Sequence, residues 1–161
     1  MNKNIVALLN AQIQKEFESA YLYLFFASYV DDNGLDGFSN WFRHQAEEEE
    51  EHAMKFYDYL HETNQQVVFF PVNLPECKAD SVIQILEATL EHEEYVTALI
   101  NTIYSECENA RDYRTKKFLE WFISEQLKEE TQSHVLITKY SMFGMSPEGL
   151  YELNKELGKR E

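Results

Sequence analysis

The sequence has little glycine and proline, with five and three among its 161 residues. These residues are typical of the tight turns that connect strands, so their scarcity disfavours a sheet architecture and favours long uninterrupted elements. The only two cysteines, Cys77 and Cys107, lack the spacing of a zinc site. A reduced, cytoplasmic chain is the simplest interpretation of so few cysteines.

Basic residues are also scarce. The chain has 14 Lys and Arg but 29 Asp and Glu, which gives a formal net charge of −15. Binding to a phosphate backbone needs clustered cations, so no nucleic-acid partner is expected. No apolar run approaches the roughly 18 residues of a membrane span, so no membrane association is expected either. The 44% of hydrophobic residues suffices for the core of one domain over 1–161.

Apolar periodicity and capping residues predict an all-α chain. The predicted N-caps of the second, third and fifth helices are Asp36, Ser81 and Ser146, and Gly34 and Gly158 are predicted stops. Gln84, three residues after Ser81, completes a capping-box pattern. The predicted helices cover about 3–31, 37–63, 81–107 and 112–142, which form a bundle over about 3–142, with a short C-terminal helix over about 146–158.

The lengths of the connections predict the topology of this bundle. The first two helices, and likewise the third and fourth, are joined by short loops, so each pair should be antiparallel neighbours. The second and third helices are joined by residues 64–80. Such a linker spans roughly 55 Å when extended, more than the roughly 42 Å height of a helix of this length. Two hairpins joined by one long crossover are therefore expected, with the apolar segment 67–70 covered by the bundle or by a second subunit.

Each long helix carries an apolar stripe at core spacing that a carboxylate interrupts near the helix midpoint. These carboxylates belong to Glu16, Glu49, Glu93 and Glu129, and His52 lies one turn after Glu49. In a bundle of helices of equal length, the helix midpoints lie at the same height whichever direction each helix runs. Four carboxylates and one imidazole should therefore meet in one dry layer of the core.

Buried carboxylates require partners, and the stripes offer no lysine or arginine. A single glutamate on a helix is usually solvated, and a single histidine more often forms a hydrogen bond than binds a metal. That interpretation does not explain four carboxylates that interrupt the stripes at one height. Two divalent cations would neutralise the charge of these carboxylates. Oxygen-rich ligands with one nitrogen and no thiolate suit iron or manganese better than structural zinc. The fourth helix offers Gln126-x-x-Glu129, so the site is asymmetric and has one histidine.

At these residues the sequence resembles the non-haem ferritins of prokaryotes, and the resemblance covers nearly the whole chain. It rests on five stretches: 9–17 with Tyr23, 44–53, 91–97, 118–126 and 148–157. The resemblance implies a ferritin-like four-helix bundle with a short fifth helix. It also implies iron storage, in which a ferroxidase oxidises Fe(II) with O₂ or H₂O₂ and deposits a ferric mineral inside a hollow shell of 24 subunits.

The same resemblance implies roles for the residues of the dry layer. Glu49 should bridge two irons, and Glu16 and His52 should complete the first iron site. Glu93 and Glu129 should complete the second iron site. The catalytic candidates Tyr23 and Gln126 should lie close by.

Two departures from the family pattern change the expected ligands. Several members bind a third iron, for which the weaker candidates here are Glu48 and Glu125 together with Glu129. Lys128 stands where those members have another glutamate, so weak or absent occupancy is expected. The haem-binding relatives have a methionine next to the bridging glutamate, where this chain has Glu50, so no haem is expected.

Three alternatives share parts of this pattern. A rubrerythrin-like di-iron redox enzyme would usually carry a second Glu-x-x-His and often an added Cys-rich domain. A DNA-protecting mini-ferritin would lack the fifth helix. A non-catalytic helical bundle would have no use for carboxylates at the core midpoints. Iron storage is therefore the preferred prediction.

Overall fold

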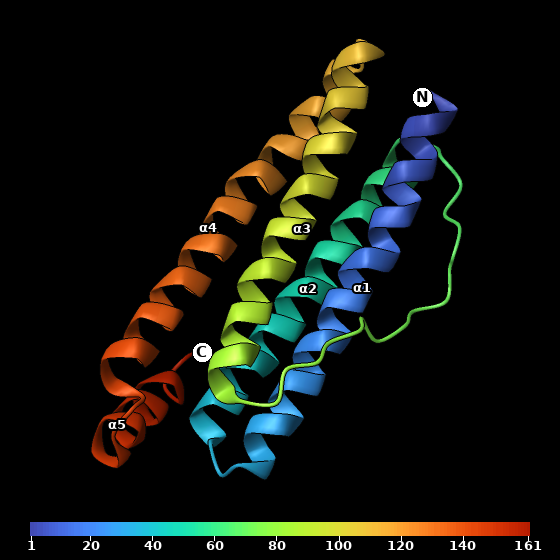
Figure 1. The fold of residues 1–161 in the computed structure, drawn as a ribbon. Helices are drawn as coiled ribbons and strands as arrows, with labels where there is room; N and C mark the ends of the chain where they lie inside the picture. The colour runs from blue at the N-terminus through green and yellow to red at the C-terminus, as the bar shows by residue number, and fades with distance from the viewer.

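The computed structural model describes residues 1–161 as five helices without a strand (Figure 1). They are α1 (Lys3–Asp32), α2 (Asp36–Glu62), α3 (Val82–Asn109), α4 (Tyr113–Phe143) and α5 (Pro147–Leu157). The hairpin of α1 and α2 lies beside the hairpin of α3 and α4, and α5 packs against α2 and α4 at one end. The predicted bundle and fifth helix are confirmed. The largest difference in bounds is at the end of α3, predicted at Cys107 and found at Asn109.

None of the five helices carries an apolar stretch long enough to cross a bilayer. Residues 63–81 contain no helix or strand and run along the outside of α1 (Figure 1). Asn10 holds the start of this linker, because its Nδ2 donates to Gln66 O at 3.1 Å and its Oδ1 accepts from Val68 N at 2.6 Å. At the other end Tyr29 Oη donates to Asp80 O at 2.6 Å. The predicted crossover is therefore pinned to α1 near both of its ends.

Three of the long helices end in the same way. A left-handed residue follows each C-cap: Gly34 after α1 (φ 76°), Asn64 after α2 (φ 57°) and Arg111 after α3 (φ 55°). In each case the two backbone N–H groups after the C-cap bond back to carbonyls of the last turn. The stop predicted at Gly34 is confirmed, whereas Arg111 shows that a residue with a side chain occupies the same conformation here.

The start of α2 differs from the prediction. Asp36 is the first residue of the helix rather than its N-cap, and Leu35 at the cap position offers no side-chain acceptor. The cap comes from α5, where Asn154 Oδ1 accepts from the backbone N–H groups of Gly37 (2.9 Å) and Phe38 (3.1 Å). A Cβ at Gly37 would lie 1.6 Å from the Asn154 carbonyl oxygen, so only glycine permits this approach.

The start of α3 follows the predicted pattern with one shift. Ser81 Oγ accepts from Gln84 N at 3.3 Å, as a capping box requires. Gln84 Oε1 returns a bond to the backbone N–H of Asp80 at 3.0 Å, one residue before the cap. The predicted N-cap at Ser146 also accepts from Gly149 N at 3.1 Å.

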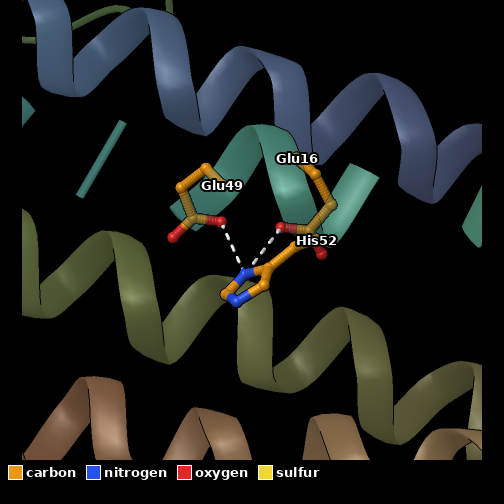
Figure 2. A group of neighbouring side chains, drawn as sticks. All are labelled: Glu16, Glu49 and His52. Atoms are coloured by element: carbon orange, nitrogen blue, oxygen red, sulfur yellow. Dashed lines mark hydrogen bonds and ion pairs between the residues drawn. The ribbon is translucent and has the colours of Figure 1, made fainter. Parts of the chain in front are cut away.

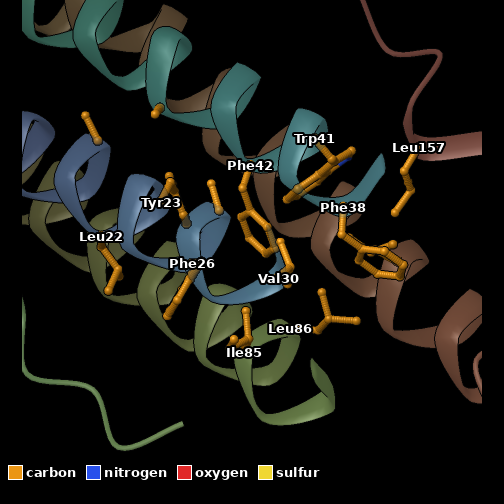
Figure 3. Close-up of a cluster of buried hydrophobic side chains, with 14 of the residues drawn as sticks. Leu22, Tyr23, Phe26, Val30, Phe38, Trp41, Phe42, Ile85, Leu86 and Leu157 are labelled. Atoms are coloured by element: carbon orange, nitrogen blue, oxygen red, sulfur yellow. The ribbon is translucent and has the colours of Figure 1, made fainter. Parts of the chain in front are cut away.

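The apolar core consists of two clusters separated by a polar layer. The cluster near the α1–α2 turn contains Tyr23, Phe26, Phe38 and Phe42 (Figure 3). The other cluster lies toward the N-terminus of α1 and contains residues such as Leu9, Phe56 and Phe122. In every long helix the change from one cluster to the other falls where a buried glutamate interrupts the stripe.

Candidate metal centre

The residues predicted to form the dry layer are all buried. Glu16, Glu49, Glu93 and Glu129 are each at most 1% exposed, and His52 is 3% exposed. Each of the four long helices contributes one of the glutamates, because the stripe that faces the bundle axis places one polar residue at mid-height. The tertiary structure therefore brings together residues that are more than 100 positions apart in sequence.

One half of the layer is built by Glu16, Glu49 and His52 (Figure 2). His52 Nδ1 lies 3.2 Å from Glu49 Oε2 and 4.0 Å from Glu16 Oε2. One ligand atom from each of the three residues lies within 4.8 Å of the others, close enough to hold one metal ion. Gln12 donates to Glu16 Oε1 at 2.8 Å, while Glu16 Oε2 has no hydrogen-bond partner.

The other half contains Glu93 and Glu129. Glu93 Oε1 accepts from the phenol of Tyr23, and its Oε2 accepts from Gln126 Nε2 at 3.1 Å. Glu129 Oε2 accepts from Gln45 Nε2 at 2.9 Å, while Glu129 Oε1 has no partner. Both predicted catalytic residues, Tyr23 and Gln126, thus lie in direct contact with Glu93.

Burial raises the pKa values of three of these carboxyl groups, and repulsion between neighbouring carboxylates adds to the effect. Burial, followed by the charges of Glu93 and Glu16, raises the pKa of Glu49 well above its usual range. Burial raises the pKa of Glu93 to about 7. Burial, followed by the charge of Glu93, raises the pKa of Glu129 to about 8. No lysine or arginine is among the buried residues, so the layer lacks a cation of its own.

The donor set fits metal ions of the kind predicted from sequence. Unpartnered buried carboxylate oxygens, such as those of Glu16 and Glu129, are rare in proteins because each loses its hydration without compensation. A divalent cation would satisfy these oxygens and neutralise the excess charge. Oxygen ligands with a single imidazole suit iron or manganese.

Two of the predicted third-site residues, Glu48 and Glu125, carry ion pairs. Lys128 Nζ lies 2.8 Å from Glu125 Oε1 and 3.7 Å from Glu48 Oε1. Arg160 Nη2 lies 3.2 Å from Glu48 Oε2. Burial lowers the pKa of Lys128, but the hydrogen bond to Glu125 and the charge of Glu48 outweigh it, and the net shift is upward. Glu125 Oε1 also lies 3.8 Å from His52 Nε2. His52, Glu125 and Glu129 form a second group whose ligand atoms lie close enough to hold a metal ion, so this group shares His52 with the first.

Some contacts of the layer were absent from the sequence prediction. Gln12 and Gln45 each precede a layer glutamate by four residues, a spacing that places side chains on one helix face and could have indicated them. Arg160 lies after the last helix, and no pattern in the sequence indicates its contact with Gln45.

Comparison with known proteins agrees with this fold. Residues 6–143 match the family described as ferritin-like domain. The "bacterial non-heme ferritin" of Campylobacter jejuni is 38% identical over 151 residues, 94% of this chain and 90% of that protein. The protein of the same name from Staphylococcus saprophyticus is 32% identical over 160 residues, 99% of this chain and 96% of that one.

Solved structures agree at the level of the whole fold. A structure described as a novel open pore ferritin from Archaeoglobus fulgidus superposes with a TM-score of 0.96 at 38% identity, covering 100% of this chain and 99% of that chain. An engineered closed form of the Archaeoglobus fulgidus ferritin also has a TM-score of 0.96, with 38% identity, and covers 100% and 98%. The family match covers most of the chain, and these relatives are similar to it over nearly its whole length. The chain therefore belongs to the ferritin family.

Proposed function

We propose that this protein oxidises Fe(II) at the buried glutamate layer and stores the product as a ferric mineral. Iron storage is the function of the family to which the chain belongs. The proposed oxidation site rests on one observation. Two carboxylate oxygens, Glu16 Oε2 and Glu129 Oε1, have no hydrogen-bond partner in a layer without a buried lysine or arginine. Fe(II) is the substrate in this proposal, with O₂ or H₂O₂ as the oxidant.

The proposal assigns about two iron ions per subunit, as in other two-metal helical bundles. Glu16 and His52 bind the first iron, Glu93 and Glu129 bind the second, and Glu49 bridges the two. Carboxylates are hard ligands that favour the ferric state, so binding here makes iron a better electron donor. Because Glu93 and Glu129 have raised pKa values, binding of the second cation releases protons from these groups.

Gln126 and Tyr23 act on the second iron site through Glu93. Their hydrogen bonds to the two oxygens of Glu93 orient its carboxylate toward the layer. Tyr23 is also proposed to donate an electron during oxidation. A transient tyrosyl signal that disappears in Tyr23→Phe would support this role, and an unchanged signal would contradict it.

The proposal further places the protein in the cytoplasm as a homo-oligomeric shell of 24 subunits without haem. The exposed apolar side chains of the linker, including Phe69 and Phe70, support assembly because a monomer leaves them in water. Glu50 occupies the position of the haem-binding methionine and is exposed. Electron microscopy of the purified protein tests the shell, and its absorption spectrum tests the absence of haem.

Aerobic addition of Fe(II) to the metal-free protein tests the function. Far more iron per subunit than the layer can bind indicates storage, whereas about two per subunit would indicate a di-iron redox enzyme. No bound iron would contradict both. Glu49→Gln should slow the oxidation by at least about tenfold, because it removes the shared charged ligand at nearly unchanged shape. Glu50→Gln, the exposed neighbour on the same helix, is the matched control and should oxidise iron at the rate of the parent protein.

A further inference from the structure

The end of the chain lies against α2, close to the metal layer. Asn40 of α2 donates to the backbone oxygens of Leu157 at 3.2 Å and Arg160 at 3.0 Å. The cap that Asn154 provides for α2 holds the preceding helix in the same place. The backbone that carries the Arg160 side chain is therefore anchored at two points.

Several contacts orient the guanidinium of Arg160. Its Nη1 donates to the Trp41 carbonyl at 3.0 Å, and Cζ lies 5.0 Å from the centroid of the Trp41 ring. Its Nη2 donates to Gln45 Oε1 at 2.7 Å and lies 3.2 Å from Glu48 Oε2. With only 17% of this side chain exposed, the group is held mainly by protein rather than by water.

Contact with Arg160 determines which way the Gln45 amide points. A guanidinium only donates hydrogen bonds, so the end of Gln45 that faces Arg160 is Oε1. The amide nitrogen then faces Glu129 and donates to its Oε2 at 2.9 Å. The reversed amide would direct its oxygen at the carboxylate and its NH₂ at the guanidinium, and both contacts would be repulsive. Because Gln45 and Glu129 are both buried, no water replaces a lost partner.

We infer that Arg160 is a positioning residue for the metal centre, which acts through Gln45 to hold Glu129 with one oxygen engaged and the other available to a cation. The available oxygen is Glu129 Oε1, which has no hydrogen-bond partner. Partners behind a metal ligand in this way fix its orientation and support its affinity. The inference rests on the proposed function of the layer, and it extends the site to the C-terminal tail.

Titration of the metal-free protein with Co(II) tests this role, because its visible absorption reports each binding step without turnover. Arg160→Ala should weaken the step that involves Glu129 by about tenfold to a hundredfold. The step at Glu16, Glu49 and His52 should keep its affinity. Lys159→Ala removes the same charge from an exposed neighbour and should bind Co(II) like the parent protein. Equal weakening of both steps, or no change in Arg160→Ala, would overturn the inference.

A double-mutant cycle separates positioning from a simple charge effect. Gln45→Leu interrupts the path from Arg160 to Glu129, so adding Arg160→Ala to it should produce no further loss of Co(II) affinity. A full additional loss would show that Arg160 acts through Glu48 or through space, and would refute the inference. If the parent protein binds no Co(II) in the layer, the proposed function fails as well, whereas normal parent binding confines a negative result to Arg160.

Discussion

Lys128 is a cation beside the metal layer, and its charge opposes metal binding there. Its ammonium group pairs with Glu125 and approaches Glu48, which also pairs with Arg160. Such partly exposed ion pairs contribute little to stability. The main consequence of Lys128 is therefore the number of cations that this part of the site accepts.

Lys128→Glu should add a metal-binding step. The substitution removes the tethered cation and supplies a ligand, so anaerobic Fe(II) titration should show roughly one more bound iron per subunit than in the parent protein. Lys128→Met, which removes the charge without adding a ligand, is the matched control and should show a smaller gain. An unchanged stoichiometry in Lys128→Glu would mean that Arg160 alone closes this region to cations.

The carboxyl groups of the layer predict how stability depends on pH. In the metal-free folded protein the pKa values of Glu93 and Glu129 are about 7 and about 8, against roughly 4.3 for glutamate in an unfolded chain. Between these limits the folded state binds more protons than the unfolded state. The free energy of unfolding should therefore fall as pH rises from about 4.5 to about 8.

Thermal unfolding of the metal-free protein across this pH range is the measurement. Glu129→Gln should show a shallower decline, because the amide does not titrate, and bound Co(II) should reverse the slope by favouring the deprotonated form. A melting temperature that rises with pH in the metal-free parent protein would contradict the raised pKa values.

At the scale of elements, α5 supplies what the start of α2 lacks. Asn154 satisfies two orphan N–H groups of the first turn of α2, those of Gly37 and Phe38, and Gly37 makes the close approach possible. A residue of α5 thus caps the start of α2, although the two helices are far apart in sequence. The docked α5 in turn places the segment that carries Arg160.

Asn154→Ala should destabilise this junction by about 1 kcal/mol, the usual effect of losing an N-cap. Hydrogen exchange should accelerate in α5 and in the first turn of α2 while the middle of the bundle stays protected. Asn101→Ala, at an exposed position of α3, is the control and should leave exchange at the junction unchanged. Uniform acceleration along the whole chain would argue against a local role.

For the whole molecule, the crossover both connects the hairpins and exposes an apolar surface. Its backbone is pinned to α1, but several of its apolar side chains are exposed: Phe69 is 74% exposed, and Val68, Phe70, Val72 and Leu74 are exposed as well. Tyr21, Leu24 and Phe25 of α1 are also exposed. Cover by the bundle or by a second subunit was expected for residues 67–70, and the bundle supplies it for Val67, which packs against the apolar core, but leaves these exposed side chains uncovered.

Phe69→Asp should impair assembly without unfolding the subunit. A charge placed in a buried apolar contact is costly, whereas at this position in the monomer it faces water. Size-exclusion chromatography should show a shift from large assemblies to small ones, with helical content unchanged by circular dichroism. Assemblies of parental size would place the linker outside the subunit contacts.

The sequence by itself predicted the helices, their order and the crossover because periodicity, caps and connection lengths are local properties of the chain. It also predicted the dry layer, since a glutamate at each helix midpoint reaches the same height in any antiparallel arrangement. Only the tertiary structure decided the partners of those glutamates. The contacts of Gln45 with Glu129 and with Arg160 both depend on the rotation of each helix and on where the C-terminal tail docks. Those positions result from packing between distant segments, for which one sequence contains no local signal.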